Sequence, residues 1–111
     1  MSWNILLFET NRGERPVEEF VESLLPSTQS KVVSLVRLLR EFGTFLKMPH
    51  SKKVTKNLYE LRVRGKEETR IFYAFSGDRI YLLHAFKKKS QNIPLKEIKL
   101  AENRLSSLDK L

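Results

Sequence analysis

Residues 58–89 read LYELRVRGKEETRIFYAFSGDRIYLLHAFKKK, and this stretch decides the fold. Its three runs are rich in aromatic and β-branched residues and are separated by turn residues, first at Gly65 and then at Ser76-Gly77-Asp78. Runs of this kind, bounded by turns, are typical of β-strands, and loops this short join antiparallel neighbours. The stretch therefore predicts three consecutive antiparallel strands followed by a basic tail.

Alternation along the first two runs divides their side chains between two faces, because successive strand residues point to opposite sides. In the first run one face takes Tyr59, Leu61 and Val63, and the other takes Glu60, Arg62 and Arg64. In the second run one face takes Ile71, Tyr73 and Phe75, and the other takes Arg70, Phe72 and Ala74. Both runs are thus expected to carry arginine on one face of the sheet.

A three-residue loop over 65–67 would place Arg62 opposite Arg70 and Arg64 opposite Glu68. Two guanidinium groups facing each other repel, so a fold keeps such a pair when an anionic group completes the site. Lys87, Lys88 and Lys89 end the third run and are expected near the same edge. Five cations on one sheet face predict a phosphate pocket. The alternative is a solvated face with scattered cations.

The flanking segments predict one further strand and three helices. The strand is expected over 3–9, and the helices over 16–25, from Ser27 as N-cap to about Phe42, and from Pro94 onward. Residues 44–57 are expected to be irregular. The order β-α-α-β-β-β-α predicts an α+β fold. We expect a mostly antiparallel four-stranded sheet with a helical hairpin on one face and the other face partly open.

Composition limits the possible functions. The chain has 111 residues, enough for one domain over 1–111. Its formal charge of +8 indicates a polyanionic or acidic partner. With no cysteine and two distant histidines, we expect neither a metal site nor a cofactor. We see neither a spanning segment nor a signal peptide, so a cytoplasmic protein is expected.

A site rich in cations and poor in metal ligands suits RNA cleavage, in which the 2′-hydroxyl attacks the adjacent phosphate. The substrate carries its own nucleophile, so the protein only needs to orient it, stabilise charge and assist proton transfer. Arginine suits the phosphate oxygens, and a lysine among cations can move protons. Glu60 could act as a base but is favoured as a charge partner. His84 is favoured as a hydrogen-bonded core residue, and the position of His50 stays open.

Other residues could extend the site. Lys53, in the loop over 47–53, would add to a basic surface, although a solvated loop is the simpler interpretation. Exposed aromatics such as Phe72, Tyr73 or Tyr81 could stack on bases, although most aromatics here are more simply core residues.

Three motifs, taken together, resemble a known family. Residues 59–62 (YELR), 69–73 (TRIFY) and 82–89 (LLHAFKKK) are similar to the HigB branch of the RelE/ParE toxin superfamily. The resemblance covers nearly the whole chain, including Pro94 and residues 98–104. It implies a RelE-like fold and a type II toxin that cleaves mRNA on the ribosome without a metal. It also implies a cognate helix-turn-helix antitoxin.

The resemblance also assigns site residues. Arg70 matches an arginine that contacts the scissile phosphate, Arg62 matches a basic residue on the preceding strand, and Lys87 and Lys88 match a basic pair. The remaining predicted substrate contacts are Lys53, Arg64, Phe72 and Lys89. Unlike the RelE branch, the chain has Glu60 at a basic position and Ile93-Pro94 where a stacking aromatic is expected. The general base and the stacking residue therefore stay open.

Two other functions remain in view. A non-catalytic inhibitor of a protein such as DNA gyrase would tolerate changes at Arg62 and Arg70. A nucleic-acid-binding module without cleavage would bind in a salt-dependent way and would not arrest growth. For the nuclease, Arg70→Ala is expected to abolish cleavage and leave the fold intact.

Overall fold

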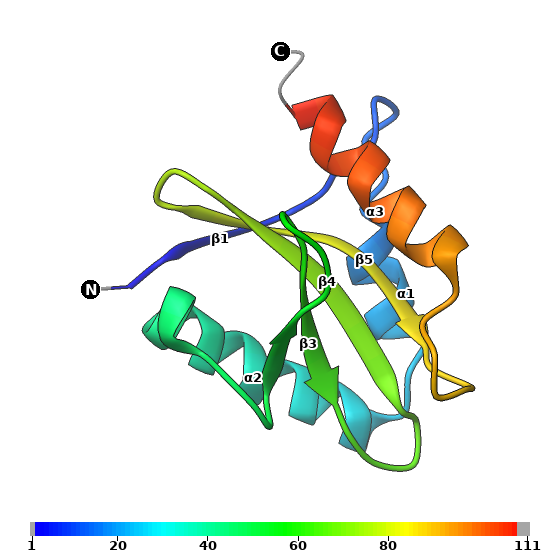
Figure 1. The fold of residues 1–111 in the computed structure, drawn as a ribbon. Coiled ribbons are helices and arrows are strands. Elements are labelled where there is room, and N and C mark those ends of the chain that lie inside the picture. The colour runs from blue at the N-terminus through cyan, green and yellow to red at the C-terminus, as the bar shows by residue number, and fades with distance from the viewer. Residues whose placement is uncertain (1, 109–111) are drawn as a thin grey trace.

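The structure is a computed structural model that describes residues 2–108 (Figure 1). Its strands are β1 (Asn4–Leu7), β2 (Ser51–Lys53), β3 (Tyr59–Val63), β4 (Thr69–Ser76) and β5 (Arg79–Lys87). Its helices are α1 (Pro16–Glu22), α2 (Pro26–Phe42), the 3-10 turn η1 (Gly43–Phe45) and α3 (Leu95–Leu108). The fold is therefore mixed α+β, as predicted.

One sheet holds all five strands, in the order β1-β5-β4-β3-β2. The three strands of residues 59–87 are consecutive and antiparallel, as the sequence predicted, and Arg62 lies opposite Arg70. A two-residue turn joins β4 to β5, and Gly77 there has φ +62°, a conformation that favours glycine. β1 completes the sheet by pairing parallel to β5.

The prediction of four strands is wrong, because β2 lies inside the stretch that we expected to be irregular. β2 pairs antiparallel with β3 and places Ser51 opposite Leu61. Its sequence, SKK, is too short and too polar to show an alternating pattern. Tertiary contacts hold it instead, since the buried Ser51 hydroxyl is hydrogen-bonded to the Tyr73 hydroxyl on β4.

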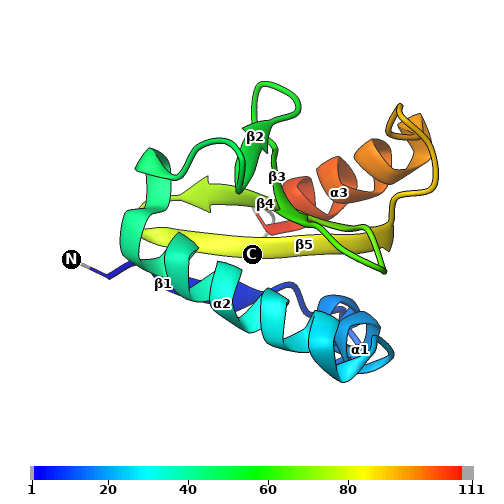
Figure 2. The same cartoon turned by 90° about the horizontal axis from the view of Figure 1, so that it is seen from below.

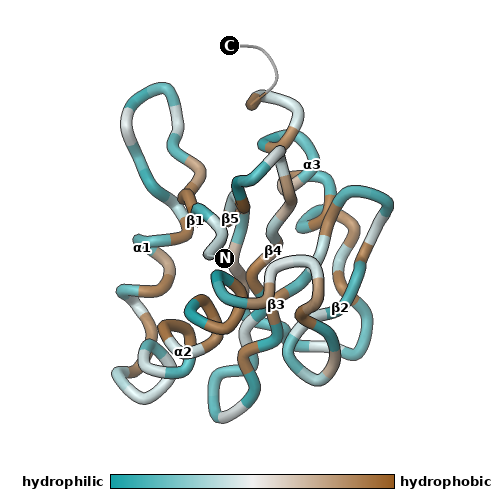
Figure 3. The backbone as a smooth tube through the Cα atoms, turned by 90° about the vertical axis from the view of Figure 1, so that its left-hand side faces the viewer, coloured by the Kyte–Doolittle hydropathy of each residue, from teal (hydrophilic) through white to brown (hydrophobic). Residues whose placement is uncertain are grey.

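Helices cover both faces of the sheet, with α1 and α2 on one side and α3 on the other (Figure 2). The first face packs Leu61, Val63, Ile71 and Tyr73 against residues of α1 and α2. The second packs Phe72, Ala74 and Phe86 against α3. Hydrophobic residues gather where these layers meet, while the β1–α1 loop is hydrophilic (Figure 3).

The second face is therefore less open than we predicted, because α3 lies along β5 and β4. Its residues Ile98, Ala101, Leu105 and Leu108 belong to the core or pack against it. Leu95, the first residue of α3, is exposed. No helix in the described residues is both long and apolar enough to cross a membrane.

The ends of α2 differ in part from the prediction. α2 begins at Pro26, with Leu25 rather than Ser27 at its N-cap. Glu67 in the β3–β4 hairpin explains this start, because its carboxylate accepts the Leu25 N–H at 2.8 Å. Gly43 follows the last residue of α2, as predicted, and has φ +51°.

Candidate functional site

Arg62 and Arg70 share the second face of the sheet with two glutamates, and we call Glu60, Arg62, Glu68 and Arg70 the arginine cluster. Glu60 lies between the arginines: Oε1 is 3.5 Å from Arg70 Nε, and Oε2 is 3.8 Å from Arg62 Nε. Glu68 Oε2 accepts a hydrogen bond from Arg70 Nη1 at 3.0 Å. The anionic group that we expected to complete the arginine pair is therefore a carboxylate of the chain itself.

Burial separates the roles of the two arginines. The Arg70 side chain is only 2% exposed, whereas that of Arg62 is 16% exposed. Arg70 thus lies behind the surface, held by two carboxylates and by the Thr69 carbonyl. Arg62 is the arginine of the cluster that reaches the surface. The two carboxylates offset the free-energy cost of burying the Arg70 guanidinium.

The cluster is loosely bonded at its centre. Among the described residues, Glu60 Oε1, Arg62 Nε and Arg70 Nε are buried and make no hydrogen bond. Their ion-pair distances of 3.5 and 3.8 Å exceed a normal hydrogen bond. Glu68 differs. Burial alone would raise its pKa, but hydrogen bonds from the Gly65 N–H and from Arg70 and Arg64 hold the pKa below the ordinary value.

The three lysines do not converge as predicted. Lys87 lies on the opposite face, where its Nζ is 3.1 Å from Glu67 Oε2, because it follows Phe86 and strand residues alternate. The prediction of five cations on one face is therefore wrong. Lys88 follows the strand on the cluster's side by alternation, and its N–H donates to the Glu68 carbonyl. Lys89 is exposed beyond the end of β5.

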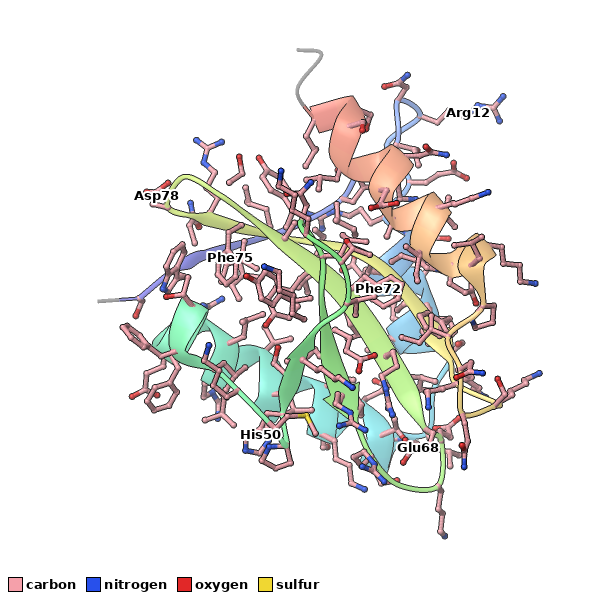
Figure 4. The ribbon with its side chains drawn as sticks, viewed as in Figure 1. Arg12, His50, Glu68, Phe72, Phe75 and Asp78 are labelled. Carbon is pink, nitrogen blue, oxygen red and sulfur yellow. The ribbon has the colours of Figure 1, made fainter. Side chains whose placement is uncertain are left out.

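The predicted substrate contacts also separate. Lys53 lies over the Tyr59 ring, with Nζ 5.8 Å from the centroid. Arg64 is exposed and pairs with Glu68 at 3.2 Å. Phe72 is fully buried and packs edge-on against Phe86 in the core under α3 (Figure 4). The prediction that Phe72 stacks on a base is therefore wrong. Tyr73, which was also considered for stacking, is buried as well.

A groove of about 490 Å³ opens beside the cluster, between α2 and the edge of the sheet. We call it the basic groove. Its lining residues are Ser30, Lys31, Ser34, Leu35, Leu38, Pro49, His50, Arg62 and Arg64. Three of these are cations and one is a histidine, and none of the described lining residues is acidic. The groove can therefore bind an anion along one wall and an apolar group along the other.

Backbone contacts hold the polar residues of the groove in place. The His50 carbonyl accepts the Arg62 N–H at 2.8 Å, which extends the β2–β3 pairing by one residue. Lys31 Nζ donates to the Arg64 carbonyl at 2.9 Å. His50 lies at the same end of the sheet as Glu68 (Figure 4). The groove thus brings α2, the segment before β2 and the end of β3 together.

Sequence reasoning missed Lys31 and could not place His50. Pairing of residues 51–53 with β3 would have placed His50 beside Arg62, but the sequence SKK does not indicate a strand. Lys31 lies on the exposed side of an amphipathic helix, where lysine is ordinary. Only the packing of α2 against the sheet makes it part of a site.

His84, the other histidine, attaches α3 to β5. Its Nε2 is 2.9 Å from Glu97 Oε1, and Arg104 on α3 donates to the Leu83 carbonyl at 2.8 Å. Burial lowers the pKa of His84, against the opposing effect of Glu97. The prediction that His84 is hydrogen-bonded is confirmed, but its side chain is 13% exposed rather than fully buried in the core. Across residues 2–108, no group of three or more His, Asp or Glu is arranged to hold a metal ion.

Comparison with known proteins identifies the family. Residues 19–106 match the family described as Phage derived protein Gp49-like (DUF891), whose members are RelE/HigB-like toxins. No curated protein matches the chain. Toxins of this kind usually pair with an antitoxin. The matched region includes the arginine cluster and the basic groove, and it covers most of the 111 residues. The chain therefore belongs to the Gp49-like phage-derived family of RelE/HigB-like toxins.

Proposed function

We propose that this protein is the toxin of a type II toxin–antitoxin system and that it cleaves mRNA on the ribosome. The observation that carries the proposal is the position of Arg62. It lines the basic groove beside His50, and behind it the Glu60 carboxylate lies between Arg62 and the buried Arg70. The Glu60 carboxylate behind the guanidinium, together with the hydrogen bond from Arg62 Nη1 to the Met48 sulfur, would orient it before a phosphate arrives.

The proposed reaction needs no metal. The 2′-hydroxyl of one nucleotide loses its proton and attacks the adjacent phosphorus, and the 5′-oxygen of the next nucleotide leaves and takes up a proton. The products are a 2′,3′-cyclic phosphate and a 5′-hydroxyl. Arg62 would stabilise the charge on the phosphate oxygens through paired N–H donors. His50 lines the same groove, and its imidazole would transfer the proton.

Arg70 has a different role in this proposal from the one that the resemblance implies. Its guanidinium is 2% exposed and is held by Glu60 and Glu68, so we assign it to positioning these carboxylates rather than to contacting the phosphate. Lys88, half-buried on the same face, and the exposed Arg64 and Lys89 would hold neighbouring phosphates. Lys87, on the opposite face and paired with Glu67, is left out of the catalytic group.

The proposed partner is a helix-turn-helix antitoxin, encoded beside the toxin, that neutralises it. Family membership supports this partner, because toxins of the family usually pair with an antitoxin. The net charge of +8 fits both an acidic protein segment and RNA. Co-expression with the product of the adjacent gene should restore growth, and the two chains should co-purify.

The burial of Arg70 favours a second candidate, a toxin that inhibits a protein target without cleaving RNA. The Arg70 guanidinium is paired with two carboxylates and is only 2% exposed, so a phosphate has little access to it. In that case the basic groove would bind an acidic protein surface. This candidate predicts growth arrest without RNA cleavage.

Mapping of RNA 5′ ends after brief induction tests the proposal. The strains would express wild type, Arg62→Ala or Arg37→Ala, where Arg37 is an exposed arginine on α2 outside the basic groove. New ends inside translated codons are expected with wild type and with Arg37→Ala, and not with Arg62→Ala. Growth arrest without new ends would overturn the nuclease in favour of the inhibitor.

A further inference from the structure

An exposed apolar patch lies where α2 ends. Phe45 is 81% exposed, Met48 is 56% exposed and Phe42 is 47% exposed. Two phenylalanines exposed to this degree within four residues are unusual, because burying such a ring is favourable by about 2 kcal/mol. Neither belongs to the two core clusters of the described chain. The patch is therefore outside the core packing and available for binding.

The patch continues the basic groove. Leu35 and Leu38 form the apolar wall of the groove on α2, and Phe42 lies one helical turn beyond Leu38. Phe45 follows in η1. On the other wall, Met48 comes just before Pro49 and His50, and its sulfur accepts a hydrogen bond from Arg62 Nη1 at 3.0 Å. The segment after η1 runs back from the end of α2 to β2 (Figure 1).

We propose that Phe42 and Phe45 form a base-stacking platform for single-stranded RNA whose phosphates lie in the basic groove. This inference rests on the proposed function and adds a subsite to it. Proteins that bind single strands combine a cationic track for the backbone with aromatic rings on which bases stack. Here the track is Lys31, Arg62 and Arg64, and Phe42 lies one helical turn beyond the groove residue Leu38.

The burial of the other aromatics supports this assignment. Phe72 and Tyr73, which the sequence offered as stacking residues, are at most 1% exposed. Phe42 and Phe45 are the phenylalanines among the described residues that are exposed as large hydrophobic side chains. Their exposed rings offer apolar surface on which a base could stack, and each base provides a π-face whatever its identity. The platform should therefore bind RNA with little sequence preference.

Charge distinguishes RNA from a protein as the occupant. The described residues that line the groove include cations and no carboxylate, so a bound chain must carry regularly spaced negative charge beside flat apolar groups. Single-stranded RNA has this pattern along its whole length. A protein segment would need acidic residues against the groove and apolar residues against the two rings.

Equilibrium binding to an uncleavable strand tests the inference. The purified full chain would be titrated into fluorescently labelled 2′-O-methyl oligouridine, and binding followed by fluorescence anisotropy. A strand of equal length with abasic sites keeps the phosphates and removes the bases. The variants are Phe42→Ala/Phe45→Ala and the control Val33→Ala, which removes an exposed apolar side chain of the same helix outside the groove.

Loss of stacking predicts a selective change in affinity. The double variant should bind oligouridine about tenfold more weakly than wild type. Its affinity for the abasic strand should equal that of wild type, and Val33→Ala should match wild type on both strands. Equal affinity of the double variant and wild type for oligouridine would overturn the inference and assign the patch to a protein partner. Failure of wild type to prefer oligouridine over the abasic strand would overturn it too.

The binding experiment separates this inference from the proposed function, because it does not depend on cleavage. If wild type stacks bases but no new 5′ ends arise in cells, the platform stands and the nuclease fails. If cleavage depends on Arg62 but the double variant binds normally, the nuclease stands and the platform fails.

Discussion

Glu60 and Arg70 form an ion pair inside the sheet face, with Oε1 3.5 Å from Nε and with side chains only 6% and 2% exposed. Glu68 pairs with the same guanidinium from the end of the hairpin. The pair joins β3 to β4 directly beside the basic groove, because Arg62 is the opposite residue to Arg70 in the register. Arg62, the proposed phosphate-binding residue, thus lies beside a buried ion-pair network.

Arg70→Ala should destabilise the protein, contrary to our expectation from the sequence that the fold would remain intact. Removing the guanidinium leaves Glu60 buried without its closest cation, and breaking a buried pair in this way costs about 3–5 kcal/mol. Urea denaturation of the variant and of wild type measures this change in the free energy of unfolding.

Arg64→Ala is the matched control, because Arg64 also pairs with Glu68 but its side chain is exposed. An exposed pair contributes at most about 1 kcal/mol, so this variant should stay close to wild type. If both variants unfolded at the same urea concentration as wild type, the buried network would have no energetic role.

His84 should make stability depend on pH near neutrality. Burial lowers its pKa, so the unfolded chain binds a proton more readily than the folded chain. The contribution of neutral His84 is therefore complete above its ordinary pKa of about 6.5 and is lost as the pH falls below that value. Urea denaturation should show the advantage of wild type over His84→Gln shrinking between about pH 7.5 and about pH 5.5.

Ser106→Ala provides the comparison for this titration, because it removes an exposed side chain of α3 that does not titrate. Its difference in stability from wild type should stay constant through the same pH range. An advantage of wild type over His84→Gln that grows on acidification would show that His84 is protonated in the folded state.

The ionised carboxylate of Glu67 should stabilise the contact between the β3–β4 hairpin and the start of α2. A hydrogen bond from the Thr28 hydroxyl, together with the Leu25 N–H, holds its pKa below the ordinary value. The stabilisation is then present above the ordinary pKa and is lost as the pH falls through the lowered one. Glu67→Gln should melt below wild type near neutral pH, and the two melting temperatures should converge in acid.

Glu22→Gln, at the exposed end of α1, is the control for Glu67. In thermal unfolding followed by circular dichroism, this control should have the same melting temperature as wild type at every pH. A constant difference between Glu67→Gln and wild type down to about pH 2.5 would mean that the carboxylate charge has no role at the start of α2.

Gly43→Ala should destabilise the junction of α2 and η1. Gly43 has φ +51°, which side chains disfavour, and an added Cβ would meet the Trp3 indole. The two effects together should lower the free energy of unfolding by about 2 kcal/mol or more. Gly13→Ala is the control, since Gly13 also has positive φ but open space around it. Equal losses in the two variants would mean that the Trp3 contact is unimportant.

The strands and their register were predictable because their signals are local. Alternation in residues 59–63 and 69–75 assigned the faces, and the loop length placed Arg62 opposite Arg70. The same local reasoning missed β2, whose three polar residues are held by pairing with β3 and by the Ser51–Tyr73 contact. A strand that is stabilised mainly by contacts with other elements need not show an alternating pattern in its own sequence.

The candidate site was predictable only in part, for a related reason. Charge and register identified Arg62 as a site residue. The burial of its neighbours was not predicted: Arg70 lies behind carboxylates and Phe72 lies in the core. Phe86 lies opposite Arg70, so alternation along β5 predicts that Lys87, the next residue, points to the other face of the sheet from the arginines. Lys31 and His50 needed the docking of α2 beside β3, which no short stretch of sequence encodes.

The most direct test of RNA cleavage by this protein uses programmed ribosomes carrying an mRNA with one 2′-deoxynucleotide at the mapped cleavage position. Wild type is expected to cleave the all-ribose mRNA, leaving a 2′,3′-cyclic phosphate and a 5′-hydroxyl, and not to cleave the substituted mRNA at that position. Cleavage of the deoxy-substituted mRNA at the same position, or no cleavage of either, would contradict the proposed reaction.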